Sequence, residues 1–284
     1  MSLHITWLGQ SGYLLEGAGQ RVVIDPYFSD VVERVEGLRR LVPPPCPVAA
    51  LKPDTLLITH DHLDHFDEET VAAILQSAPA CKLIGPASVM KHAAKMGLAA
   101  VRLTPLASGE KLTLGGIAIT ATPARHSEPS SVGLLIQVEN ILLWFSGDTL
   151  YFPGLAPQVL QLAGRPPDIA CVCVNGKLNN MSAADAARLM AALQPRLAVP
   201  AHYGMFAENT VDPGEFVAAC ARLGQPAAVL PCGRAMNGAT LLEKSVRSQP
   251  REPIATSTSP LTTGANKAGM QDGSCWPSAS SWIR

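Results

Sequence analysis

The chain has 284 residues, of which 47% are hydrophobic and 16% are charged. That is enough apolar content for one sizeable core or two small ones, and it excludes a disordered or coiled-coil protein. The 22 basic and 23 acidic side chains give a net charge of −1, which excludes the extended basic surface of a nucleic-acid-binding protein. No stretch reaches the ~20 apolar residues of a membrane span, and the first residues lack a signal-peptide pattern. We therefore expect a soluble, cytoplasmic protein without nucleic-acid or membrane partners.

The seven cysteines are scattered along the chain and show none of the paired spacing of a zinc knuckle. Their odd number and wide separation argue against a disulfide framework. Cys171 and Cys173 lie within the apolar stretch 169–174, which predicts core residues rather than a redox pair.

The first third of the chain is predicted to begin with three short strands. Alternating apolar and polar residues, separated by glycines, place them at 5–8, 13–15 and 21–24. Residues 30–54 contain several charged residues and three consecutive prolines, which predicts a surface loop or lid. A buried strand follows at 56–58. Asp67 and two glutamates then predict the start of a helix that runs to about Gln76.

The remaining chain is predicted to supply three further helices and five further strands. The helices are expected at 87–96, at 183–193 and from 212 to 224, each with a start or stop signal such as Gly97, Ser182 or Pro213. The strands are expected at 117–121, 132–138, 141–145, 169–174 and 197–200. Strands from two stretches of chain, each accompanied by helices, predict an α/β fold with two packed sheets and helices outside.

The composition changes at about Ser245 to serine, threonine, proline and glycine, without periodic apolar residues. Such a segment cannot bury enough apolar surface to fold. The predicted domain organisation is therefore one folded domain, residues 1–244, and a disordered C-terminal tail, residues 245–284.

Three imidazoles and two carboxylates fall within six positions, from His60 to His65, between the predicted strand at 56–58 and the following helix. In an extended segment, residues i and i+2 point to the same side, so His60 and His62 can bind one ion. Asp64 and His65, on the turn into the helix, then face a neighbouring point. A solvated polar turn is the alternative, but so many histidines would rarely gather in one turn by chance. The spacing predicts a site for two metal ions.

Three single residues extend this candidate site, because each follows a predicted buried strand: His126, Asp148 and His202. Loops at the ends of strands are where binding sites are commonly built. Each residue alone would more often be an ordinary core or loop residue, but together they complete a ligand set. All donors in the set are nitrogen or oxygen, which suits Zn²⁺, Mn²⁺ or Fe²⁺.

The order of these residues resembles the pattern of the metallo-β-lactamase-fold hydrolases over about residues 1–244: Asp25, His60-x-His62-x-Asp64-His65, His126, Asp148 and His202. The resemblance implies a four-layer αββα sandwich with two divalent ions, Zn or Mn. It implies that the first ion is held by His60, His62 and His126. It implies that the second is held by Asp64, His65 and His202, with Asp148 bridging the two. Asp25 would accept a hydrogen bond from a ligand imidazole and fix its tautomer.

Residues 174–181 and 202–210 look similar to the corresponding segments of the L-ascorbate-6-phosphate lactonase group, and residues 39–45 do so less specifically. In that group the metal is thought to be manganese, and the reaction is hydrolysis of a phosphorylated sugar lactone. Beside this resemblance, four residues that adjoin the predicted ligand loops can bind an oxyanion or a phosphate: Arg125, Asn175, Lys177 and Tyr203. Arg125 and Lys177 are equally consistent with exposed surface cations.

We therefore expect a dinuclear metal-dependent hydrolase of a small anionic ester, foremost a phosphorylated sugar lactone, that uses a metal-bridging hydroxide. Asp64 is the expected catalytic residue, because it can orient the nucleophile and take its proton. A phosphodiesterase acting on a small or nucleotide-like substrate is one alternative. The short segment between Asp148 and His202 leaves no room for the clamp domain of large nucleases. A non-catalytic metal-bound scaffold or sensor is the other alternative, and the complete ligand set argues against it. The sequence leaves a homo-oligomer open.

Overall fold

The computed structural model describes residues 2–247, so residues 248–284 of the predicted tail lie outside the described residues. The last described element is α7 (Gly238–Arg247), which continues three residues beyond the predicted end of the domain at 244. No helix within 2–247 combines the length and the apolar character that a membrane crossing requires.

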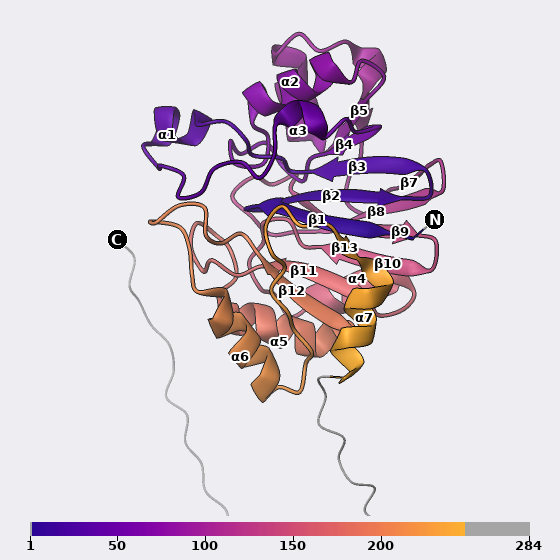
Figure 1. Ribbon diagram of the computed structural model, residues 1–284, viewed down its shortest axis with the longest axis vertical. Helices are drawn as coiled ribbons and strands as arrows, with labels where there is room; N and C mark the ends of the chain where they lie inside the picture. Colours follow the sequence, from indigo (N-terminus) through magenta and orange to yellow (C-terminus); the bar gives the residue numbers. More distant parts are fainter. Residues whose placement is uncertain (1, 248–284) are drawn as a thin grey trace, which may run out of the picture. The chain divides into compact units, whose positions relative to one another are not determined.

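Two sheets form the centre of the fold (Figure 1). The first has the order β13-β1-β2-β3-β4-β5-β6, with antiparallel pairing from β13 to β3 and parallel pairing from β3 to β6. Its strands are β1 (His4–Gly9), β2 (Gly12–Gly17), β3 (Gln20–Ile24), β4 (Thr55–Leu57), β5 (Lys82–Gly85), β6 (Leu103–Pro105) and β13 (Met236–Asn237). The three predicted N-terminal strands and the strand near 56–58 thus belong to one sheet.

The second sheet has the order β12-β11-β10-β9-β8-β7. Its strands are β7 (Lys111–Leu114), β8 (Ile117–Pro123), β9 (Val132–Val138), β10 (Ile141–Phe145), β11 (Ile169–Cys173) and β12 (Leu197–Ala201). All five strands predicted for this half of the chain are present. Every residue of β11 and β12 is buried, which explains why these strands appear in the sequence as continuous apolar runs.

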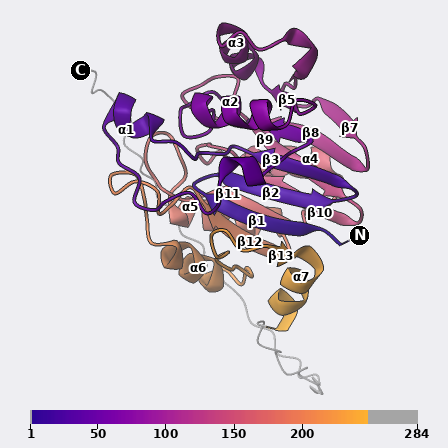
Figure 2. The same cartoon turned by 45° about the horizontal axis from the view of Figure 1, so that its top comes forward.

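The sheets pack face to face and helices cover their outer faces. One core contains Ile5, Leu15 and Val22 of the first sheet together with Ile119 and Leu143 of the second. A separate core joins the other face of the first sheet to α2 (Glu68–Ser77) and α3 (Ala87–Lys95). On the far side, α4 (Leu155–Ala163), α5 (Ala183–Leu193) and α6 (Pro213–Arg222) contribute to the first core (Figure 2). Helix, sheet, sheet and helix are the four layers that the sequence predicted.

Side-chain caps explain three of the four predicted helix starts, whereas α3 begins after Pro86 without one. Asp67 accepts hydrogen bonds from the backbone amides of Glu69 and Thr70, Ser182 accepts one from Asp185, and Asp212 accepts one from Gly214. Helix α4 was not predicted, because its N-cap is Gly154 without a side-chain cap and Pro157 stands in its first turn. Helix α4 lacks the local start signals that identified the other three.

The predicted loop or lid at 30–54 contains the short helix α1 (Val31–Glu36) and the 3-10 turn η1 (Val48–Ala50). Its middle part is attached to the segment after β12, because the backbone amide of Leu41 donates to the carbonyl of Met205 at 2.7 Å. This segment of the chain therefore lies beside the loop that carries His202.

Candidate metal centre

The predicted ligands follow four strands whose carboxyl ends meet at one edge of the sheets. β8 and β10 are both antiparallel to β9, and β10, β11 and β12 pair in parallel, so β8, β10 and β12 run in the same direction. His126, Asp148 and His202 follow these three strands, and the segment 60–65 follows β4 of the first sheet. Residues that are far apart in the sequence thereby reach one place.

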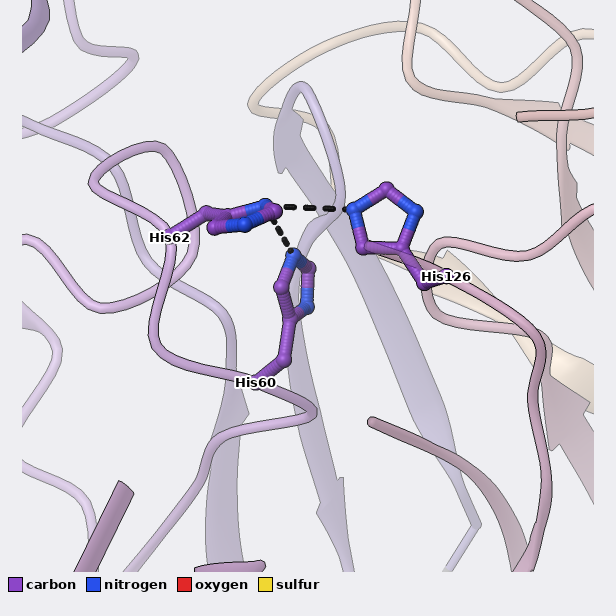
Figure 3. Close-up of side chains that lie close together, drawn as sticks. All are labelled: His60, His62 and His126. Atoms are coloured by element: carbon purple, nitrogen blue, oxygen red, sulfur yellow. Dashed lines mark hydrogen bonds between the residues drawn. The ribbon is translucent and has the colours of Figure 1, made fainter. Parts of the chain in front are cut away.

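The first group consists of His60, His62 and His126, whose rings point toward one another (Figure 3). Nδ1 of His62 lies 3.0 Å from Nε2 of His60 and 3.1 Å from Nε2 of His126. Burial lowers the pKa of His60 well below its usual value and also lowers the pKa of His126. Both rings are therefore neutral near pH 7, which is the form of histidine that binds a metal.

The second group consists of Asp64, His65 and His202. Oδ2 of Asp64 lies 3.2 Å from Nε2 of His202 and 3.7 Å from Nε2 of His65. Burial lowers the pKa of His202, but the carboxylates of Asp148 and Asp64 outweigh this effect and raise it to about 9. Burial and carboxylates compete in the same way at His65, where the carboxylates also raise the pKa.

Asp148 contacts residues of both groups. Its Oδ2 lies 3.1 Å from Nε2 of His202 and 3.9 Å from Nε2 of His126, and its Oδ1 lies 3.3 Å from Nε2 of His65. The amide nitrogen of Asn180 donates to Oδ2 of Asp148 at 2.7 Å. Asp148 is thus the residue that links the two groups.

The buried polar atoms at this point fit a bound cation. Nε2 of His65 and Oδ1 of Asp148 are both buried and lie 3.3 Å apart, and within residues 2–247 neither has a hydrogen-bond partner. Buried polar atoms normally have a hydrogen-bond partner, so two neighbouring buried atoms without one are unusual. A divalent cation held by imidazole nitrogen and carboxylate oxygen would satisfy both atoms. The residues present therefore fit a metal centre.

Asp25 lies behind the second group. Its Oδ2 is 2.8 Å from Nδ1 of His65 and accepts a hydrogen bond from Oγ1 of Thr59, while its Oδ1 accepts one from the Thr59 amide. These contacts leave Nε2 of His65 as the ring nitrogen that faces Asp148. Asp25 therefore occupies the supporting position that the resemblance implies.

The four predicted substrate-binding residues differ in their surroundings. Arg125 is exposed and its guanidinium lies 4.1 Å above the Phe152 ring. Lys177 is also exposed, and its Nζ donates to the Glu208 carbonyl. It belongs to the segment 176–180, whose Asn179 carbonyl is 3.2 Å from Nδ1 of His126. Both cations therefore lie on segments that contact the ligands.

Asn175 and Tyr203 are instead buried and engaged with other residues. The amide nitrogen of Asn175 donates to Oδ1 of Asn209 at 2.7 Å, and the Tyr203 ring stacks on Trp7 with 4.7 Å between centroids. Adjacency to a ligand loop in the sequence did not distinguish these buried residues from the exposed cations. A substrate-binding role for any of the four stays a prediction.

Asn180 and Gln10 are among the residues that contact predicted ligands without having been predicted. Asn180 holds Asp148, and Gln10 donates from its Nε2 to Oδ2 of Asp64 at 2.8 Å. Gln10 lies in the turn between β1 and β2, far from the ligand motifs in the sequence. Its position between two glycine-containing strand ends gives no local sign of a functional role.

The chain is similar to known proteins over most of its length. The family described as "Beta-lactamase superfamily domain" matches residues 20–203. A UPF0173 protein of Pyrococcus furiosus is 33% identical over 217 residues, covering 75% of this chain and 89% of its own. A UPF0173 metal-dependent hydrolase of Pyrobaculum calidifontis is 30% identical over 220 residues, covering 76% of this chain and 91% of its own.

Among solved structures, the metallo hydrolase Igni18 of Ignicoccus hospitalis is similar in fold, with a TM-score of 0.66 and 22% identity. The similarity covers 83% of this chain and 98% of that one. The two packed sheets, the His/Asp centre and these matches lead to one conclusion. The chain belongs to the UPF0173 family of metal-dependent hydrolases, within the metallo-β-lactamase superfamily.

Proposed function

We propose that this protein is a dinuclear metal-dependent hydrolase of a small anionic ester, most specifically a phosphorylated sugar lactone. The observation that carries the proposal is the position of Asp148, which contacts His126 of the first group and His65 and His202 of the second. A carboxylate between two ligand groups can be shared by a pair of metal ions.

Each of the two proposed ions would have its own set of ligands. The first ion would be held by His60, His62 and His126, and the second by Asp64, His65 and His202, with Asp148 shared. Imidazole and carboxylate donors suit Zn²⁺ or Mn²⁺. When bound, such ions polarise a carbonyl oxygen and lower the pKa of water.

Asp64 is the proposed catalytic carboxylate. Burial raises its pKa, but His65 and His202 outweigh this and keep the pKa well below its usual range, so Asp64 is ionised at neutral pH. An ionised carboxylate can accept a hydrogen bond from an attacking water and orient it. So low a pKa favours this orienting role over storage of the abstracted proton.

An anionic substrate is supported by the cations around the centre. Arg125 and Lys177 are exposed on segments that contact His126 or Asp148. The same cations would bind a phosphodiester, so this substrate class is the second candidate.

The deciding experiment is a substrate screen of the protein after metal removal and reconstitution with Zn²⁺ or Mn²⁺. The panel contains a phosphorylated sugar lactone, its dephosphorylated counterpart, a phosphodiester, a thioester and a β-lactam. We expect metal-dependent opening of the phosphorylated lactone, with two metal equivalents per chain and no turnover by Asp148→Asn. Preferential cleavage of the phosphodiester would replace the lactone by the second candidate. Metal binding without hydrolysis of any member would favour a scaffold or sensor and overturn the proposal.

A further inference from the structure

Gln10 is a completely buried glutamine at the edge of the metal centre. Its exposed fraction is 0%, and its backbone adopts a φ of +49°, a left-handed conformation that non-glycine residues adopt only rarely. Its carbonyl oxygen accepts hydrogen bonds from Nε1 of Trp7 and from the backbone amide of His202, both at 3.0 Å. The main chain of Gln10 is therefore attached directly to the main chain of a predicted ligand.

The side chain of Gln10 reaches the same group of ligands. Its Nε2 donates to Oδ2 of Asp64 at 2.8 Å and lies 3.2 Å from Nε2 of His202. Asp64 and His202 come from loops that follow different sheets, and Gln10 contacts both. Among the described residues, its side-chain hydrogen bonds go to this second group and none goes to His60, His62 or His126.

A purely structural role explains these contacts poorly. Oε1 of Gln10 is buried and has no hydrogen-bond partner within residues 2–247. Burial of an unpaired amide oxygen is unfavourable, so a residue that only filled space here would be apolar. What the amide provides at this position is the N–H group directed at Asp64. The hydrogen bond to Asp64, rather than the packing of the side chain, explains why a polar residue is present at this position.

We propose that Gln10 is a positioning residue for the second metal ion, the ion of Asp64, His65 and His202. Its N–H holds Oδ2 of Asp64 beside Nε2 of His202, and its carbonyl holds the backbone of His202. Ligands that are oriented before the metal arrives lose less conformational freedom on binding, so affinity rises. The effect is specific to the second ion, because no described hydrogen bond joins the first group to this amide. The inference rests on the proposed dinuclear centre.

The test measures metal affinity, independently of any substrate. Metal-stripped parent protein and Gln10→Met are titrated with Zn²⁺ in competition with a chromogenic chelator. Methionine keeps the length of the side chain and removes the donor. We expect two binding steps in the parent. In Gln10→Met, we expect one step unchanged within about threefold and the other weakened ten- to a hundredfold, as for other residues that support metal ligands. His62→Ala and His202→Ala identify which step belongs to which group.

The matched control is Gln225→Met. Gln225 is also buried, but its Nε2 donates to the Pro195 carbonyl, away from the centre. Both binding steps should stay at the parent value in this variant. If Gln10→Met does not fold, as judged by thermal unfolding, Gln10→Asn replaces it, because its shorter amide withdraws from Asp64 and should give the same selective loss.

The titrations distinguish the positioning role of Gln10 from the existence of a dinuclear centre. If the parent binds two ions and Gln10→Met or its replacement weakens neither step, or weakens both equally, the inference is wrong and the dinuclear proposal stands. If the parent binds a single ion, the dinuclear proposal itself fails. Selective loss of the step assigned to His202 supports both.

Discussion

Nδ1 of His65 lies 2.8 Å from Oδ2 of Asp25, and both side chains are almost completely buried. The Asp25 carboxylate has little freedom, because the amide and the hydroxyl of Thr59 also donate to it. The orientation of the His65 ring is thereby set by a residue forty positions earlier in the chain. We expect this contact to determine how well His65 binds a metal.

Asp25→Asn tests that expectation. The substitution preserves the shape of the side chain but removes the charge that favours a proton on Nδ1 of His65. We expect the affinity for the second metal ion to fall by about ten- to a hundredfold, measured by chelator competition. Affinity within twofold of the parent would show that the ring is oriented by its packing alone.

His62→Ala and Asp148→Asn test the two ligand groups. His62 belongs to the first group only, whereas Asp148 contacts both. Elemental analysis should show loss of about one metal equivalent in His62→Ala and weaker binding of both ions in Asp148→Asn, because each change removes a ligand. Hydrolysis of every substrate should be lost in both variants. Activity within about tenfold of the parent would contradict the assigned centre.

Lys177→Ala and Arg125→Ala test the anionic substrate. If either cation binds a remote phosphate, kcat/KM for the anionic substrate should fall by about ten- to a hundredfold, which is ~1.5–3 kcal/mol for a charge-assisted contact. The neutral analogue and the metal content should be unaffected. Lys111→Ala, at an exposed lysine of β7, is the control. Equal losses of kcat/KM on the charged and neutral substrates would mean that Arg125 and Lys177 only maintain the structure of their loops.

Asp168 gives a prediction about stability that does not involve the metal centre. Its Oδ2 accepts hydrogen bonds from the Leu142 amide and from Arg165, both at 2.8 Å, and Arg196 approaches its Oδ1. Burial raises the pKa of Asp168, but the contacts with Arg165 and Leu142 outweigh this and lower it below 3.8. We expect Asp168→Asn to reduce the free energy of unfolding at pH 7 by ~1–3 kcal/mol.

The pH dependence of that effect follows from the direction of the pKa shift. A carboxyl group whose pKa is lower in the folded state stabilises the fold at pH values above its unfolded-state pKa. This stabilisation is lost as the pH falls through the folded-state pKa. Urea unfolding should therefore show the difference between parent and Asp168→Asn narrowing as the pH is lowered from 7 to 3. Glu69→Gln, which removes an exposed pair with Arg34, should change the unfolding free energy by less than about 1 kcal/mol. A constant difference at all pH values would contradict the ionic origin of the effect.

The sequence by itself determined the elements that have local signals. Patterns of apolar residues located nine of the thirteen strands in the described part of the chain but not β5, β6, β7 or β13, and the caps Asp67, Ser182 and Asp212 located three helices within a residue or two. Such signals act over a few neighbouring residues, so they can be recognised without knowledge of the fold. The same locality explains why α4, which begins without a side-chain cap, was not predicted.

The candidate metal-binding residues were also apparent from the sequence, because strand ends that carry histidine and aspartate are few in this chain. Only the tertiary structure decided which residues support them. Gln10 and Asn180 contact Asp64 and Asp148 across long stretches of sequence, whereas Asn175, which directly follows the predicted strand 169–174, is buried against Asn209. A hydrogen bond between distant loops depends on how two sheets pack and where their strand ends meet. That packing is a property of the whole core, so no local pattern of residues records it.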